Sequence, residues 1–138
     1  MKNTLQKTSE AYSSLIGIPY SEAHCWEIVK RFYKIEFDIE LNHIATEGID
    51  YVRDKKAVQT AIWAYRKDFL KVESGYQFGD IVLMRIRALE SHIGVYVGSN
   101  KLLHTLEQTG CVVDLLPRWV NNVVGVYRLH DTNKVKCR

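Results

Sequence analysis

Residues 91–104 read SHIGVYVGSNKLLH, a stretch that predicts two β-strands joined by a tight turn. Apolar residues occupy every second position of the first strand, as expected for a strand that buries one face. The Gly-Ser-Asn sequence at 98–100 is typical of a turn, because Gly and Asn tolerate positive φ angles. This predicted hairpin is the starting point for the rest of the fold.

The length of the turn determines which side chains share a face of the hairpin. If residues 98–100 form the whole loop, Gly94 lies opposite His104. His92 and His104 then lie on the same face, diagonally across the two strands and within side-chain reach. Two histidines in this arrangement suggest a base and the group that orients it, and Cys25 is the candidate nucleophile.

A helix is predicted around the candidate nucleophile. From Cys25 to Tyr33, apolar side chains recur at i, i+3, i+4, i+7 and i+8, which makes one buried stripe. Ser21 and Glu22 supply capping chemistry, so Cys25 is expected in the first turn, facing the core. A helix N-terminus and a nearby imidazolium both lower the pKa of a thiol, and the N–H groups of that turn suit an oxyanion.

The remaining patterns predict an α+β fold of one domain, residues 1–138, with a core at about 15–129. We expect a short helix before Leu15, a second long helix over about 54–70, a helical turn at 117–119, and polar ends. Strands are expected at 81–86, 91–97, 101–107, 111–115 and 123–129. Helices followed by a run of short strands predict helices packed on a curled antiparallel sheet of about five strands.

Composition excludes several classes of function. The chain has 138 residues, 46% of them hydrophobic, and a net charge of +3, which is too weak to indicate nucleic-acid binding. No apolar run is long enough for a membrane span, and the first residues lack the pattern of a signal peptide. Three cysteines without a spacing pattern argue against disulfides, so synthesis in a reducing cytoplasm is expected, and no cofactor motif is present.

Plainer interpretations of the three candidate residues remain open. Cys25 alone could be a small buried apolar residue on a helix stripe, and each histidine could be a satisfied polar residue on a sheet face. Cys25, His92 and His104 could instead bind zinc, although the sequence has no close ligand pair such as Cys-x-x-Cys.

Six short motifs occur in order along the chain. They are GIPY at 17–20, CW at 25–26, FGDIV at 78–82, HIGVYVG at 92–98, LLH at 102–104 and GVYR at 125–128. Together they resemble the NlpC family of papain-like cysteine peptidases, which act on bacterial cell-wall peptides. The Cys-Trp pair resembles most closely the members found in bacteriophage tails.

This resemblance implies a papain-like fold and a Cys-His-His triad at Cys25, His92 and His104, with Tyr20 near the substrate. The usual reaction of the family is hydrolysis of the D-glutamyl–diaminopimelate bond in peptidoglycan stems, without a metal or other cofactor. The expected partners are a stem peptide and phage tail proteins. The expected location is the virion tail, acting on the cell wall after synthesis in the bacterial cytoplasm.

The residues around the nucleophile depart from the common family pattern. The family usually has Asp before the cysteine and Ser-Gly or Trp-Gly after it, whereas this chain has His24 before it and Trp26-Glu27 after it. The missing Asp and Ser are associated with holding the free amine of the substrate. His24 and Trp26 therefore become candidate substrate-binding residues. We expect poor activity on a bare dipeptide with a free amine and better activity on longer stems or intact sacculi.

Three functions are compatible with these patterns. The first is a thiol peptidase or amidase on cell-wall peptides. The second is a structural or adaptor protein of a phage tail that keeps the fold without turnover. The third is a transferase that uses the same thiol with an amine acceptor.

Overall fold

The computed structural model describes residues 11–41, 56, 69–86 and 89–129, with no account of the side chains of 89–91. A 3₁₀ turn, η1 (Ala11–Leu15), precedes the long helix α2 (Cys25–Phe37). Six strands follow, namely β1 (Phe69–Lys71), β2 (Ile81–Ile86), β3 (Leu89–Tyr96), β4 (Lys101–Leu106), β5 (Gly110–Leu115) and β6 (Val123–Leu129). A second 3₁₀ segment, η3 (Leu116–Asn122), lies between β5 and β6.

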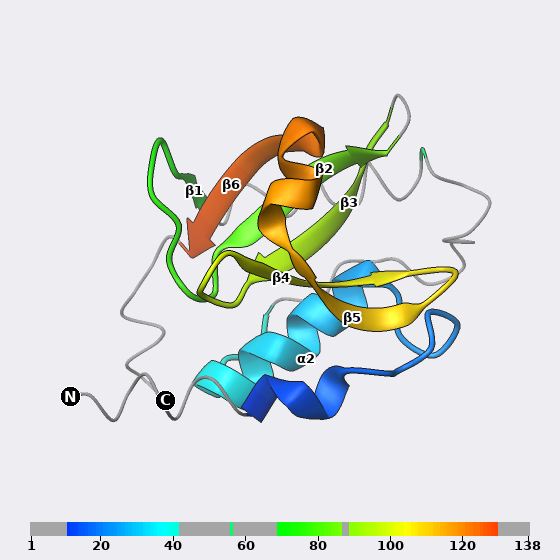
Figure 1. Cartoon of the computed structure of the whole chain (residues 1–138). Helices are drawn as coiled ribbons and strands as arrows, with labels where there is room; N and C mark the ends of the chain where they lie inside the picture. The colour runs from blue at the N-terminus through cyan, green and yellow to red at the C-terminus, as the bar shows by residue number, and fades with distance from the viewer. Residues whose placement is uncertain (1–10, 42–55, 57–68, 87–88, 130–138) are drawn as a thin grey trace.

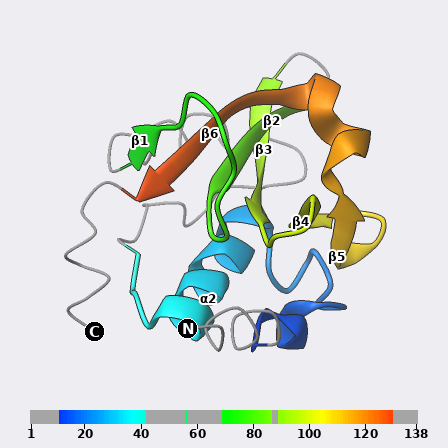
Figure 2. The same ribbon diagram turned by 60° about the vertical axis from the view of Figure 1, so that its left-hand side comes forward.

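All six strands form one antiparallel sheet in the order β1-β6-β2-β3-β4-β5. The α+β prediction is therefore confirmed, with a sixth strand that the sequence did not reveal. In Figure 1 the sheet curls over α2, which lies along one face, while η3 lies on the other face. The same two layers are visible from the second direction in Figure 2.

Each face of the sheet buries its own apolar cluster. On the face covered by α2, the helix contributes a buried stripe that includes Ile28, Val29 and Phe32. Phe32 is fully buried, and its ring lies 5.4 Å from that of Phe78, measured between ring centroids. The opposite face buries a smaller cluster, whose members are Val82, Met84, Leu102 and Leu116 with Tyr96, Trp119 and Val123 packed against it.

An ion pair with a buried carboxylate joins the start of β2 to the end of β6. Asp80 is 1% exposed, and both of its carboxylate oxygens accept hydrogen bonds of 2.8 Å from the guanidinium of Arg128. The backbone N–H of Gln77 donates a third hydrogen bond, of 2.8 Å, to the same carboxylate. A planar guanidinium suits this two-point contact, which places β6 beside β2.

Two predicted helix boundaries are wrong. The residue that caps α2 is His24, not Ser21 or Glu22, and it makes no side-chain capping hydrogen bond. The predicted second helix cannot reach residue 70, because Phe69–Lys71 forms β1 and pairs with β6. Apart from Lys56, which is helical, the rest of that prediction lies outside the described residues, as does the predicted polar tail.

The other element predictions are confirmed to within about two residues, including the short helix before Leu15 and the helical turn at 117–119. In the part of the chain that the structure describes, no helix is both long and apolar enough to cross a membrane.

Candidate active site

The β3–β4 hairpin has the predicted register. Val95 pairs with Leu103 and Tyr96 with Leu102, which places Gly94 opposite His104. The turn at 98–100 has positive φ at all three residues, 89° at Gly98, 50° at Ser99 and 60° at Asn100. A three-residue loop therefore joins the strands, and the two histidines share a face.

The two imidazoles form a direct hydrogen bond. Nε2 of His92 lies 2.8 Å from Nδ1 of His104. Both side chains are buried, at 5% and 1% exposure. The ring of Trp119, on η3, contacts both of them.

Gly94 makes this close approach possible. A Cβ atom at position 94 would lie 2.9 Å from both Cβ of His104 and the carbonyl oxygen of Leu103. Real Cβ atoms do not approach so closely, so any other residue would push β4 away from β3.

The strands that carry the histidines separate beyond this point. β3 continues to pair with β2 as far as Leu89, and β4 pairs with β5 as far as Leu106. Between β3 and β4, however, the ladder pairs Val95 with Leu103 and Tyr96 with Leu102. His92 and His104 therefore lie at the place where β3 and β4 part.

The N-terminal end of α2 lies next to β3 and β4 (Figures 1 and 2), and the helix packs on both strands. Cys25 is the first residue of this helix, 3% exposed and part of the cluster on the α2 face. The first turn of a helix carries positive partial charge, which favours a thiolate over a thiol. The predicted position of Cys25 in the helix is thus confirmed.

The two candidate binding residues that flank the cysteine differ in exposure. Trp26 is 5% exposed and belongs to the same apolar cluster as Cys25. His24 is half-buried, and burial lowers the pKa of its imidazole, with the charges of Lys30 and Arg31 acting in the same direction and Glu27 opposing them. His24 is therefore held towards its neutral form.

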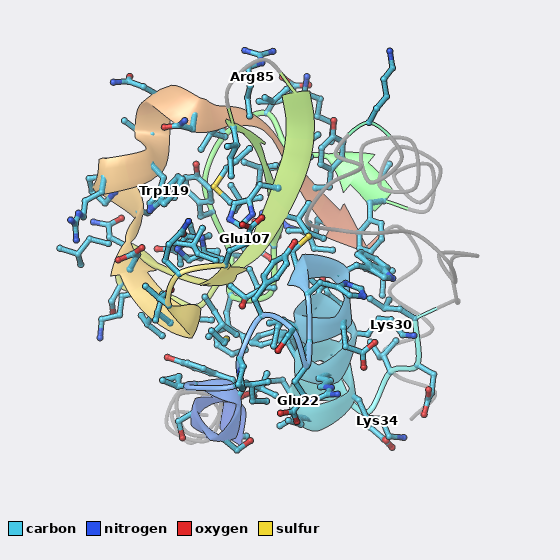
Figure 3. All side chains as sticks on the ribbon, turned by 90° about the vertical axis from the view of Figure 1, so that its right-hand side faces the viewer. Glu22, Lys30, Lys34, Arg85, Glu107 and Trp119 are labelled. Atoms are coloured by element: carbon cyan, nitrogen blue, oxygen red, sulfur yellow. The ribbon has the colours of Figure 1, made fainter. Side chains whose placement is uncertain are left out.

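Two residues of the site were not identified from the sequence. On β5, Oδ2 of Asp114 lies 2.9 Å from Nε2 of His104. On η3, Nε1 of Trp119 donates to the same oxygen at 3.2 Å, and Figure 3 shows Trp119 projecting from η3 towards the sheet. The sequence signal that could have identified Asp114 was the alternation of side chains along β5. Val112 pairs with His104, and Asp114, two residues further on, lies on the same face of the sheet.

The charge states of this pair follow from burial and hydrogen bonding. Burial lowers the pKa of His104 below its ordinary value, and the hydrogen bond and charge of Asp114 only partly offset this. Burial raises the pKa of Asp114, but hydrogen bonds from His104 and Trp119 outweigh it, so the net pKa lies below the ordinary value. The contact is thus a hydrogen bond from a neutral imidazole to a carboxylate.

A cavity of about 380 Å³ lies between the segment before α2 and the β4–β5 turn. Its lining includes Tyr20, Ser21 and Glu107. The segment is fixed to β5 by two backbone bonds, from the Gly17 amide to the Cys111 carbonyl at 2.8 Å and from the Cys111 amide to the Ile18 carbonyl at 2.9 Å. Tyr20, in the segment that leads to Cys25, therefore lines an open cavity.

Cys111 differs from Cys25 in its surroundings. It is fully buried in β5, and burial raises the pKa of its thiol to about 12. A thiol with this pKa is not a nucleophile at neutral pH. Among the described residues, no group of three His, Cys, Asp or Glu side chains is arranged to hold a metal ion, as the zinc alternative would require.

Three solved structures share this fold. They are an NlpC/P60 family protein from Bacillus cereus, NlpC1 from Trichomonas vaginalis, and a protein similar to a lipoprotein of the NLP/P60 family from Staphylococcus aureus. Their TM-scores are 0.62, 0.62 and 0.58, and their sequence identities are 16%, 13% and 16%. The predicted papain-like arrangement is confirmed by these NlpC/P60 folds.

The matches cover 91%, 92% and 95% of this chain. The chain spans 40%, 44% and 43% of the length of those three proteins, which is less than half of each. Among curated proteins, none matches the sequence significantly.

The sequence itself matches the NlpC/P60 family over residues 13–128, which is most of the chain. This range includes Cys25, both strands of the histidine hairpin and Asp114. The chain therefore belongs to the NlpC/P60 family, whose members are typically cysteine peptidases.

Proposed function

We propose that this protein is a thiol peptidase or amidase that hydrolyses peptide bonds in bacterial peptidoglycan stems. The observation that carries the proposal is the buried hydrogen bond of 2.8 Å between His92 and His104, on strands against which the Cys25 helix packs. A histidine pair of this kind holds one imidazole as a base, and a helix N-terminus activates a thiol.

In this mechanism Nδ1 of His92 accepts the proton of the Cys25 thiol. The thiolate attacks the carbonyl carbon of the substrate, and the positive end of α2 stabilises the resulting oxyanion. The imidazolium of His92 then gives its proton to the leaving amine, and a thioester remains on Cys25. A water molecule, deprotonated by His92, hydrolyses the thioester and restores the free thiol.

His104 orients the base in this scheme and does not transfer the proton. The cavity lined by Tyr20 and Glu107 takes part of the substrate. Tyr20, His24 and Trp26 are the proposed substrate-binding residues.

The bond that we propose is cleaved is of the D-glutamyl–diaminopimelate type. Because His24 and Trp26-Glu27 replace the residues associated with the free amine, we propose a preference for longer stems or intact sacculi over a bare dipeptide. We also propose delivery by a bacteriophage tail after synthesis in the bacterial cytoplasm. The support for a tail protein is the Cys25-Trp26 pair.

The test is incubation with purified stem peptides of increasing length, followed by mass measurement of the products. Hydrolysis gives two fragments whose summed mass exceeds that of the substrate by one water. A transferase would instead give amine adducts when a primary amine is added. A folded protein without products on any stem or on sacculi would point to the adaptor function and refute the proposal.

A further inference from the structure

The His92–His104 hydrogen bond can run in two directions. In one, His92 donates through Nε2–H to Nδ1 of His104, and Nδ1 of His92 keeps a lone pair. In the other, His104 donates through Nδ1–H, and a neutral His92 carries its proton on Nδ1. Since neutral imidazole has one N–H and one acceptor nitrogen, only the first direction leaves His92 able to accept a proton at Nδ1.

The partner of His104 on β5 distinguishes these two states. Nε2 of His104 lies 2.9 Å from Oδ2 of Asp114. An ionised carboxylate only accepts hydrogen bonds, so Nε2 of His104 must carry the hydrogen. Nδ1 of a neutral His104 is then an acceptor, and the bond of 2.8 Å must be donated by His92.

The carboxylate is itself held in place. Nε1–H of Trp119 and Nε2–H of His104 converge on one oxygen, Oδ2, at 3.2 and 2.9 Å. The indole also packs edge-on against His104, with ring centroids 4.9 Å apart and planes at 84°. Arg118 lies 3.7 Å from the other oxygen, Oδ1, but its side chain is 70% exposed, so solvent screens its effect.

We infer that Asp114, held by Trp119, is a positioning residue that sets the direction of the hydrogen-bond chain through His104 and leaves Nδ1 of His92 as the proton acceptor. The consequence for turnover rests on the proposed function. The direction of the chain does not, because it is a property of the folded protein without substrate.

The test combines nitrogen-15 NMR of histidine-labelled protein with kinetics on purified sacculi. In the wild type, the ring nitrogen shifts should show hydrogen on Nε2 of both His92 and His104. In Asp114→Ala, His104 loses its fixed acceptor and should populate both tautomers. We expect kcat to fall roughly 10- to 100-fold, as for outer partners of metal-bound histidines, with KM changed less than about two-fold.

Two further variants separate the carboxylate's acceptor role from its charge and from the fold. Asp114→Asn keeps an acceptor oxygen for His104 and Trp119, so it should retain the wild-type tautomers and most of the activity. Asp114→Leu fills the same space without a hydrogen-bond acceptor. It takes the place of Asp114→Ala in the test if that variant does not fold. Arg118→Ala is the matched control, since Arg118 contacts neither imidazole, and it should leave tautomers and kcat unchanged.

The inference is overturned if Asp114→Ala and Asp114→Leu keep both wild-type tautomers, or if their kcat equals that of the wild type. A wild type that cleaves nothing, while Asp114→Ala still redistributes the tautomers, would refute the proposed function and leave the positioning role intact.

Discussion

His92 and His104 are bonded through Nε2 and Nδ1 at 2.8 Å, although they stand on different strands at the point where those strands separate. Each imidazole limits the rotation of the other, and burial excludes competing water from the pair. Such a fixed, dry imidazole is what a general base requires, because its orientation costs nothing further when substrate binds.

Gly94→Ala should disrupt this relationship. The new Cβ would lie 2.9 Å from Cβ of His104, so β4 must shift away from β3. We expect a loss of about 1–3 kcal/mol in the free energy of unfolding, and activity reduced beyond that loss. Urea denaturation and turnover of folded protein measure the two effects.

The control for this substitution is Gly125→Ala on β6, where the three atoms nearest to a Cβ would all belong to the side chain of Tyr127, at 3.0 to 3.3 Å. It should lower stability without changing turnover by folded protein. Equal turnover in Gly94→Ala and Gly125→Ala would show that the fit at Gly94 does not matter to the site.

The base and its orienting partner should differ in their contributions. His92→Ala should cost on the order of 10⁴–10⁶ in kcat, by analogy with other triads, and combining it with Cys25→Ala should add little. His104→Ala should cost roughly 10²–10⁴, since it removes orientation and leaves the base in place. Steady-state rates on sacculi give these ratios, and a larger loss for His104→Ala than for His92→Ala would reverse the proposed roles.

Much of this site could be predicted from the sequence because local rules determine it. Alternation on β3 and a three-residue loop place Gly94 opposite His104, and helical periodicity places Cys25 at the start of α2. These relations depend on residues close together in the chain. The pairing of the histidines therefore follows from the sequence alone.

The missed features depend on contacts between distant segments. Strand β1 is three residues long and pairs with β6, far along the sequence, so no local period distinguishes it from a helix end. Asp114 reads as one polar residue in an apolar strand, and only the β4–β5 register brings it to His104. Trp119 contacts Asp114 and His104 because η3 folds back over the sheet, and the sequence predicts η3 only as a helical turn.

Stability should fall as the solution is acidified from neutral pH. Burial lowers the pKa of His104 below 6.5, so between the folded value and 6.5 the unfolded chain binds more protons than the folded protein. The contribution of His104 to the free energy of unfolding is complete above pH 6.5, its unfolded pKa. It is lost as the pH falls from 6.5 to the folded pKa, with a slope of at most about 1.4 kcal/mol per pH unit. The lowered pKa of Asp114 adds a second loss below 3.8.

Urea midpoints between pH 5 and 8 measure this slope. His104→Gln should flatten it, and His24→Gln should flatten it in part, because burial also lowers the pKa of His24. A wild-type midpoint that rises on acidification would contradict the burial of a neutral His104.

The Asp80–Arg128 pair should matter for folding and not for chemistry. Arg128→Met leaves a carboxylate that is 1% exposed without its two hydrogen bonds of 2.8 Å. We expect a loss of about 3 kcal/mol in the free energy of unfolding, measured by urea denaturation. The control, Arg118→Met, replaces the guanidinium of a side chain that is 70% exposed. It should change the free energy of unfolding by less than about 0.5 kcal/mol. Equal losses in both variants would show that burial of the carboxylate is not the cause.

The central claim is that Cys25 is the nucleophile of a peptidoglycan hydrolase. Its most direct test is the mass of soluble products released from purified sacculi by the wild type, Cys25→Ala and Cys111→Ala. We predict stem-peptide fragments carrying one added water per cleaved bond from the wild type and from Cys111→Ala. The Cys111 variant should stay active because the thiol that it loses is buried, with a pKa raised to about 12. Cys25→Ala should release none, and release of the same fragments by Cys25→Ala at the wild-type rate would contradict the account.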